Sequence, residues 1–316
     1  MQTANDMNKT ILFFILGLIL ITVVSFLFKA GLLKSPSPNG NKSNKIQVVT
    51  SFYPLYFFAS KVGGDKADVF NVTPASAEPH DYEPTAQEIV RIQNSQLLIL
   101  NGGVEPWGDK IKDELSDKNT VVVIAGDGLL KQQISEEGKT ELDPHIWLSP
   151  RLAKQEVNKI LEGFKKADQQ NSKYYETNAQ ILNEQLDELN MQYKKSLANC
   201  QKKDFITSHA AFGYLAHEYG LNQVAITGVS PDEEPSAQKL AELADFVTKN
   251  NIKYIFFESL VSPKLSQTLA LETGTKTLVL DPLEGIPQEE MQKGSTYMSI
   301  MQINLNNLQT ALECIK

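Results

Sequence analysis

The sequence predicts an α/β protein with two lobes, each a parallel sheet flanked by helices, bridged by one long helix. Three observations support this prediction. Short apolar runs alternate with helical patterns, the alternation occurs in two sets, and an unbroken helical pattern lies between the sets. A long apolar run near the N-terminus predicts a transmembrane segment in addition.

Eight short apolar runs are expected to form the strands. They are rich in Val, Ile, Leu and Phe, and helical segments separate them, as in parallel sheets with crossover helices. The first set is residues 46–52, 68–73, 97–101 and 120–125, and the second is residues 205–208, 223–227, 254–258 and 277–280.

Capping residues mark several helix starts. Thr85 and Glu88 form a capping-box pattern before an apolar face. Ser149 supplies an N-cap, and Pro150 occupies the first helical position that proline favours. Ser236 precedes another face with helical spacing, so three helices are expected to begin at these points.

Residues 171–199 contain neither Gly nor Pro, and their apolar positions recur at intervals of four and three. A helix of this length measures about 40 Å, which is comparable with a domain diameter. A coiled-coil partner helix is the alternative, but the strand–helix alternation resumes afterwards, which favours a bridge. The expected divisions are an anchor or signal with linker at 1–45, a first lobe at 46–168, the connecting helix at 169–200 and a second lobe at 201–316.

The N-terminal region is predicted to target the chain to a membrane. Residues 11–28 are uncharged and mostly apolar, which is long for a signal peptide and just long enough to span a bilayer. Phe28 stands where a cleavable signal ending at Ala30 requires a small residue, so an uncleaved anchor is favoured over a cleaved signal. Residues 35–45 then form a flexible linker. Lysines that follow the run would place the body in the cytoplasm, although long domains translocate largely regardless of flanking charge.

Composition excludes some classes of protein. The chain has 30 Lys and Arg against 38 Asp and Glu, with a net charge of −8, which argues against a nucleic-acid partner. Its two cysteines are too few for a Cys-based zinc finger. Cys200 and Cys314 either form one bridge that ties the C-terminus to the second lobe or remain two separate thiols.

Three of the four histidines follow predicted strands or precede a helix cap. His80, His145 and His209 lie in such segments, and Asp281 directly follows the last strand. Ligands of α/β sheets gather at the carboxyl ends of the strands, and three imidazoles with one carboxylate suit zinc, or less well manganese or ferrous iron. A single loop histidine is more often solvated, and Asp-Pro after a strand is often only a turn.

Other motifs are set aside. His217 follows His209 by eight residues on what is expected to be one helix, about 12 Å along the axis, so it is interpreted as a surface residue. No His-Glu-x-x-His pattern of zinc proteases occurs in the sequence. Residues 138–140 match the end of a P-loop, but Gln133 replaces its first glycine and no apolar strand precedes it.

Taken together, the motifs resemble those of the substrate-binding proteins of zinc/manganese ABC importers. They occur in the family's order across almost all of residues 46–316. The matching segments are residues 50–55 (TSFYPL), 79–84 (PHDYEP), 143–150 (DPHIWLSP), 208–214 (SHAAFGY), 256–259 (FFES), 261–264 (VSPK) and 280–283 (LDPL).

The resemblance implies a metal site between the lobes, with His80, His145 and His209 as imidazole ligands and Asp281 as the carboxylate. Manganese members of the family have Glu where His209 stands, so Zn²⁺ is the expected cargo rather than Mn²⁺. It also implies capture of the metal outside the cytoplasm, delivery to an ABC permease, a monomeric state and no catalytic residues.

Two features depart from the family pattern. Zinc members often have a His-rich loop before the second ligand, whereas residues 132–142 contain acids but no His. Family members are usually lipid-anchored or released into a periplasm, whereas this sequence suggests a transmembrane tether.

Two other functions stay open at this point. A zinc hydrolase could use the same ligands with Glu78 or Glu258 as a base, although four protein ligands would leave no open position for water. A metal-binding surface adhesin on the same fold is the third possibility.

Overall fold

The computed structural model describes residues 45–136 and 139–315. The expected anchor at residues 11–28 lies outside these residues. Among the residues that are described, no helix combines the length and apolar character needed to cross a membrane.

The first sheet has four parallel strands in the order β2-β1-β3-β4. Ile46 lies opposite Ala67, and Leu97 opposite Val121. All four residues of β3 are buried, which fits the continuous apolar runs of a sheet covered on both faces. The strands are β1 (Ile46–Thr50), β2 (Ala67–Asn71), β3 (Leu97–Leu100) and β4 (Val121–Ile124), and the helices of this half are α2 (Tyr53–Gly63), α3 (Ala86–Gln93), α4 (Gly108–Glu114) and α5 (Pro150–Ala167).

The second sheet also has four parallel strands, in the order β10-β9-β7-β8. Numbered within its own set, each sheet has the order second, first, third, fourth, so the two sheets share one topology. The strands are β7 (Asp204–Thr207), β8 (Asn222–Ala225), β9 (Tyr254–Phe257) and β10 (Lys276–Val279), and the helices are α7 (Gly213–Tyr219), α8 (Ala237–Lys249), α9 (Lys264–Thr273), α10 (Gln288–Gln292) and α11 (Tyr297–Ala311).

All eight predicted strands are present, and two of the three predicted caps are made. The Thr85 hydroxyl accepts from the Glu88 amide, and the Glu88 carboxylate accepts from the Thr85 amide at 2.7 Å. Ser236 accepts from the Lys239 amide at 3.2 Å. Ser149 occupies the N-cap position ahead of Pro150, but its hydroxyl makes no capping bond.

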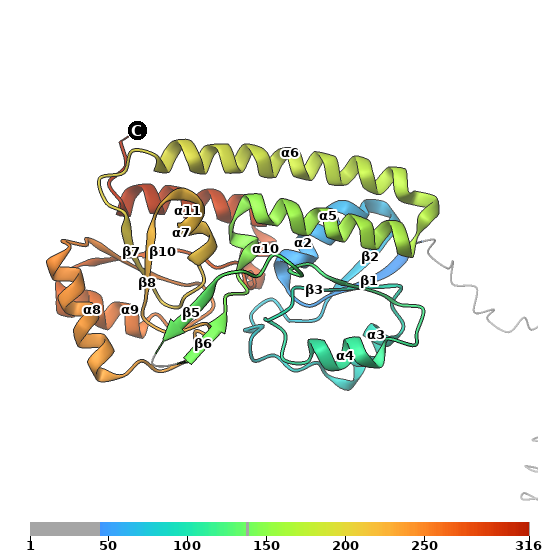
Figure 1. Ribbon diagram of the computed structural model, residues 1–316, viewed down its shortest axis with the longest axis horizontal. Helices are drawn as coiled ribbons and strands as arrows, with labels where there is room; N and C mark the ends of the chain where they lie inside the picture. Colours follow the sequence, from blue (N-terminus) through green and yellow to red (C-terminus); the bar gives the residue numbers. More distant parts are fainter. Residues whose placement is uncertain (1–44, 137–138, 316) are drawn as a thin grey trace, which may run out of the picture. The chain divides into compact units, whose positions relative to one another are not determined.

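The long helix α6 (Ser172–Leu197) has 26 residues, and its prediction over residues 171–199 is confirmed. Figure 1 shows it running past α5 in one half and α11 in the other, and it contacts α2, α5 and α11. Its buried face includes Tyr175, Leu186 and Tyr193, and the Tyr193 hydroxyl donates to the Met301 carbonyl at 2.6 Å. One apolar core therefore includes residues of both halves.

A second contact between the halves centres on Tyr297, the first residue of α11. Its hydroxyl donates to the Trp147 carbonyl at 2.6 Å, and its amide donates to the Tyr53 hydroxyl at 3.1 Å. Its ring stacks on Phe57 with the centroids 5.6 Å apart. The Trp147 indole donates in turn to the Pro282 carbonyl at 2.7 Å. These bonds fix the loop after β10 against the first half.

One element of the structure was not predicted from the sequence. An antiparallel hairpin, β5 (Gln133–Glu136) and β6 (Lys139–Leu142), follows β4. Its residues are mostly polar and several are exposed, among them Gln133, Ser135 and Leu142. Among the hairpin residues whose burial is described, none is buried, and the sequence lacks the alternating apolar pattern of a half-buried strand. The rejected P-loop segment falls on this hairpin.

Cys200 and Cys314 form a disulfide across a sequence separation of 114 residues, and no free cysteine is present in the described chain. The bridge joins the segment after α6 to the segment after α11. Next to it, the Lys202 amide donates to the Leu312 carbonyl at 3.1 Å. The disulfide therefore holds the C-terminal segment against the start of the second sheet.

Replacing both cysteines, Cys200→Ser with Cys314→Ser, should lower the free energy of unfolding by about 2–5 kcal/mol, because the bridge restricts a long loop in the unfolded chain. Urea unfolding monitored by circular dichroism measures the change. The parent protein under reducing conditions should match the double variant. Equal midpoints for the oxidised parent and the variant would contradict the stabilising role.

Candidate metal centre

The three predicted histidines come from three separate loops. His80 lies between β2 and α3, and His145 lies directly before a short 3-10 helix, Ile146–Leu148. His209 lies between β7 and α7. The side chains of His145 and His209 are fully buried, and that of His80 retains 8% of its exposure.

A carboxylate that the sequence analysis did not select brings the three imidazoles together. Oε1 of Glu284 lies 3.3 Å from Nε2 of His80, 3.1 Å from Nε2 of His145 and 3.3 Å from Nε2 of His209. Nε2 of His145 and Nε2 of His209 are 3.4 Å apart. Three nitrogens and one oxygen therefore converge on one small volume.

These separations fit a zinc ion. Ligand atoms about 2.0–2.1 Å from a tetrahedral Zn²⁺ lie about 3.3–3.4 Å from one another, because the edge of a tetrahedron is about 1.63 times its radius. The distances from Glu284 to the three imidazoles, and between the His145 and His209 imidazoles, are 3.1–3.4 Å. Four of the six donor separations of a tetrahedral site therefore have the expected length, and Glu284 is the residue common to the two candidate metal groups, His80–His145–Glu284 and His209–Glu258–Glu284.

Within this cluster, the negative charge of Glu284 and the positive charge of the imidazoles compensate each other. Burial alone would raise the pKa of Glu284, but the His209 charge and hydrogen bonds from all three imidazoles hold it well below its usual value. Burial alone would lower the pKa of His145 and of His209, but their carboxylate partners raise both. The raised pKa values favour the imidazolium forms of His145 and His209, whose charge offsets that of the buried Glu284 carboxylate.

Two further carboxylates orient two of the imidazoles in the same way. Oδ1 of Asp143 accepts from the His145 amide and from Nδ1 of His145, both at 2.9 Å. Oε1 of Glu258 accepts from the His209 amide at 3.1 Å and from Nδ1 of His209 at 2.8 Å. A proton held on Nδ1 leaves Nε2 of each ring directed at the shared centre, as outer-sphere carboxylates do for metal-binding histidines.

In the second sheet, the site lies where the strand order reverses. His209 follows β7 and Glu258 follows β9, which are the two neighbouring strands at the switch point of the second sheet. In the first sheet, Ser51 after β1 donates to Glu105 in the loop after β3. Ligands of open parallel sheets collect at such points because the connections diverge to opposite sides there.

Asp281, the predicted carboxylate ligand, is placed elsewhere. Its Oδ1 accepts from the Leu283 amide at 2.7 Å, and its own amide donates to Oδ1 of Asn304 at 2.9 Å. Burial raises the pKa of Asp281 to about 6. Among the described residues it belongs to none of the candidate metal groups, whereas Glu284 belongs to both.

Asp281 instead shapes the turn that carries Glu284. Leu283, whose amide it binds, has a φ of 61°, in the left-handed region that Leu rarely adopts. The residues from Pro282 to Ile286 are all buried. The sequence signal for Glu284 was an acidic residue within a mostly apolar stretch, because such a carboxylate requires a partner if the stretch is buried.

His217 is exposed on α7, as expected. The expectation that His209 and His217 lie on one helix was wrong, because α7 begins at Gly213 and His209 lies in the loop before it. The two histidines therefore do not share a helix.

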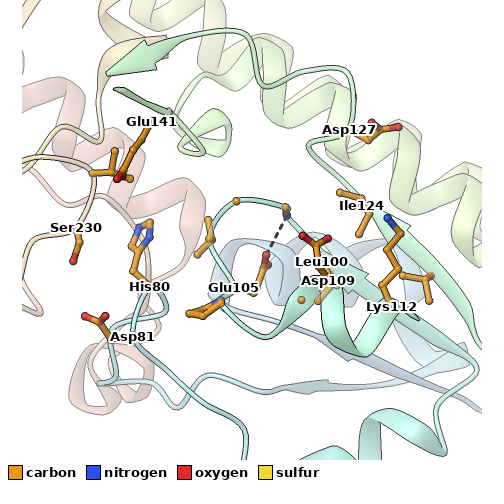
Figure 2. A pocket seen from close by; sticks show the side chains of 17 residues that line it. His80, Asp81, Leu100, Glu105, Asp109, Lys112, Ile124, Asp127, Glu141 and Ser230 are labelled. Carbon is orange, nitrogen blue, oxygen red and sulfur yellow. Dashed lines mark hydrogen bonds between the residues drawn. The ribbon is translucent and has the colours of Figure 1, made fainter. Parts of the chain in front are cut away.

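A polar cavity of about 720 Å³ opens beside His80. Figure 2 shows His80 and Asp81 at one end, near Ser230 and Glu141, and Glu105, Asp109 and Lys112 toward the other. Acidic side chains outnumber basic ones along its wall. Such a lining raises the local concentration of cations next to the partly exposed imidazole.

Two parallel sheets of one topology, with three imidazoles and a carboxylate between them, define a metal-binding protein of the solute-binding class. The chain belongs to the family described as zinc-uptake complex component A, periplasmic, whose profile matches residues 48–311.

Relatives and solved structures agree with this assignment. The high-affinity zinc uptake system protein ZnuA of Bacillus subtilis is 42% identical over 284 residues, which is 86% of this chain and 89% of that protein. The zinc-binding lipoprotein AdcA of Streptococcus pneumoniae is 42% identical over 276 residues, 84% of this chain but 55% of AdcA, so the chain spans about half of that relative. The Zn(II)-bound ZnuA-like domain of that AdcA superposes with a TM-score of 0.75 at 40% identity, covering 85% of this chain and 99% of the domain.

Glu284→Gln should lower the affinity for Zn²⁺ by at least about tenfold, because it removes the only charge that the three imidazoles share. Asp281→Asn should leave the affinity close to the parent value, because the amide oxygen can still accept from Leu283. Calorimetric titration with a chelator competitor measures both. A larger loss for Asp281→Asn than for Glu284→Gln would return the ligand role to Asp281.

Proposed function

We propose that this protein captures Zn²⁺ outside the cytoplasm with His80, His145, His209 and Glu284 and delivers it to the permease of an ABC importer. The observation that carries the proposal is the convergence of three imidazole nitrogens on one Glu284 oxygen at the spacing of a zinc tetrahedron. Its relatives are named as zinc-uptake and zinc-binding proteins, which supports the same cargo.

The ligand set favours zinc over manganese. Three imidazoles and one carboxylate form a borderline-soft donor set, whereas Mn²⁺ prefers sites dominated by oxygen. His209 is the informative position, because family members that bind manganese have Glu there. Zinc should therefore displace manganese in competition.

The ligands are divided between the two halves. His80 and His145 belong to the first sheet's half, and His209 and Glu284 to the second. A small relative movement of the halves would separate the two pairs, so the arrangement suits tight capture followed by release. We accordingly assign residues 46–168 and 201–316 as the two lobes and residues 169–200 as their connection.

The disulfide is consistent with a location outside the cytoplasm, since such bonds persist in oxidising compartments. The AdcA relative is called a lipoprotein, but the first cysteine of this sequence is Cys200. We therefore propose that residues 11–28 tether the body to the membrane, with residues 35–45 as a linker, and that the body acts as a monomer beside its permease.

The hydrolase alternative has little support from the two candidate bases. Both carboxylate oxygens of Glu258 lie 2.8 Å from Nδ1 of His209, so this group is engaged in holding the ring. In the metal-free site, burial and the Glu284 charge raise the pKa of Glu78 to about 9, and its Oε1 accepts from the His80 amide at 3.3 Å.

The adhesin alternative rests on similarity alone. The laminin-binding protein Lmb of Streptococcus agalactiae, described as having adhesin and metal-transporting activity, superposes with a TM-score of 0.77 at 32% identity. The match covers 85% of this chain and 99% of Lmb.

The central test is a zinc titration of the protein and of two histidine variants. The parent should bind one Zn²⁺ per chain and retain it against excess Mn²⁺. His209→Ala should lower the affinity by at least about tenfold, as expected for loss of a ligand, while His217→Ala on the exposed face of α7 should not. Equal losses from both variants, or no binding by the parent, would refute the proposed function.

The apparent zinc affinity should fall steeply as pH decreases from about 8 to about 5.5. The pKa values of His145 and His209 are raised in the metal-free site, so protons compete with zinc already above the usual imidazole pKa of about 6.5. Binding must then release more than one proton, and the slope of log affinity against pH measures the number. A flat profile over this range would contradict imidazole ligation.

A further inference from the structure

The Asp143 carboxylate has one oxygen that the metal site does not explain. Its Oδ1 holds His145, as described above. Its Oδ2 is buried and has no hydrogen-bond partner among the described atoms. Leaving a buried acceptor unpaired costs about 1–3 kcal/mol, and more when it is charged, so a donor is expected close by.

The backbone places Gln132 directly opposite Asp143. The Asp143 amide donates to the Gln132 carbonyl at 3.0 Å, one step beyond the Gln133–Leu142 pair of the hairpin. Residues opposite each other in an antiparallel pair project their side chains on the same face, with Cβ atoms about 4.5–5.5 Å apart. The Gln132 carboxamide therefore lies beside the Asp143 carboxylate.

The surroundings of Gly213, the first residue of α7, show where the Asp143 carboxylate and the Gln132 carboxamide lie. A Cβ atom at this glycine would lie 2.6 Å from Oδ2 of Asp143 and 3.0 Å from Oε1 of Gln132. All three residues line one cavity of about 530 Å³ beside the hairpin. The carboxylate oxygen and the carboxamide thus converge on the space that the missing glycine side chain leaves.

The adjacent residue fixes the position of Gln132. The Tyr214 hydroxyl accepts from the Gln132 amide at 3.1 Å and from the Lys131 amide at 2.8 Å. A half-turn of the Gln132 carboxamide exchanges its oxygen for Nε2, which is a donor. The unpaired acceptor and an available donor therefore occupy the same small volume, held by an element of the second half.

We propose that Gln132 is a positioning residue for the zinc site: its Nε2 donates to Oδ2 of Asp143 and locks the carboxylate that orients His145. Gly213 is required because any side chain there displaces this pair. The proposal rests on zinc binding as the function and adds the group that completes the His145 support. Glu258 needs no additional hydrogen-bond donor, because both its oxygens already contact His209.

The first test compares two neighbouring glutamines, Gln132 directly before the hairpin and Gln133 at its first position. Gln132→Met keeps the length of the side chain but removes the donor, and should weaken zinc binding by about threefold to tenfold, less than the roughly 10- to 100-fold typical when a direct partner of a ligand is lost. Gln133→Met is the matched control, because Gln133 is exposed on the next position of the strand and should bind as the parent does. Equal affinities for Gln132→Met and the parent would overturn the proposal while leaving zinc binding by the parent intact. Equal losses in both variants would assign the effect to the hairpin as a whole and would also overturn it.

A spectroscopic measurement separates positioning from general destabilisation. In the zinc-loaded protein, the Nδ1 proton of His145 should give a downfield ¹H–¹⁵N resonance because it is bonded to Asp143. In Gln132→Met this resonance should move upfield and exchange faster with water, while the Nδ1 proton of His209, bonded to Glu258, should stay unchanged. Parallel changes at both histidines, or no change at His145, would refute the role of Gln132.

Gly213→Ala provides a second variant that leaves Gln132 intact. Alanine is a better helix former than glycine, so the helix itself gains from the change. Zinc affinity should nevertheless fall, with the same shift of the His145 resonance, because the new methyl group meets Oδ2 of Asp143. Parent-like affinity in Gly213→Ala would show that the pair is not confined there and would count against the proposal.

Discussion

The burial of one carboxylate, Glu284, determines how the rest of this site is built. Its side chain keeps only 1% of its exposure, so its charge must be neutralised by groups that approach within hydrogen-bond distance. Three imidazoles do so through their Nε2 atoms, which fixes both the direction of each ring and the nitrogen that faces inward. The inward orientation of the three imidazoles and the raised pKa values of His145 and His209 both depend in part on this one buried charge.

Each imidazole needs support from its own half of the protein to meet that requirement. Asp143 and Glu258 bind the amide and the ring of His145 and His209 in the same pattern, although they come from sheets far apart in sequence. The likeness does not come from equivalent loops, because Asp143 and His145 share one segment after the β5–β6 hairpin, whereas His209 follows β7 and Glu258 follows β9. His80, in a loop beside the open cavity, is the ring that remains partly exposed.

Sequence reasoning predicted what depends on local pattern. The eight strands, the helix from Ser172 to Leu197 and the convergence of three histidines were all accessible, because apolar periodicity and position after a strand are local signals. The hairpin around residues 133–142 was not, since exposed polar strands have no such pattern. Asp281 was selected because it directly follows a strand and matches the family motif, and Glu284 was not considered, although it is Glu284 that contacts the three imidazoles in the structure. Glu156 of α5, fully buried without a hydrogen-bond partner, likewise has no local signature.

The sequence separation of the ligands has a consequence for when metal can be loaded. His80 and Glu284 meet across 204 positions, and Glu284 stands near the end of a chain of 316 residues. A chain still being synthesised, or threaded unfolded through a membrane, contains the ligands but not the site. The site can therefore assemble only after both sheets have folded and come together. Neither half alone supplies all four groups, so an isolated half cannot hold the metal as the whole chain can.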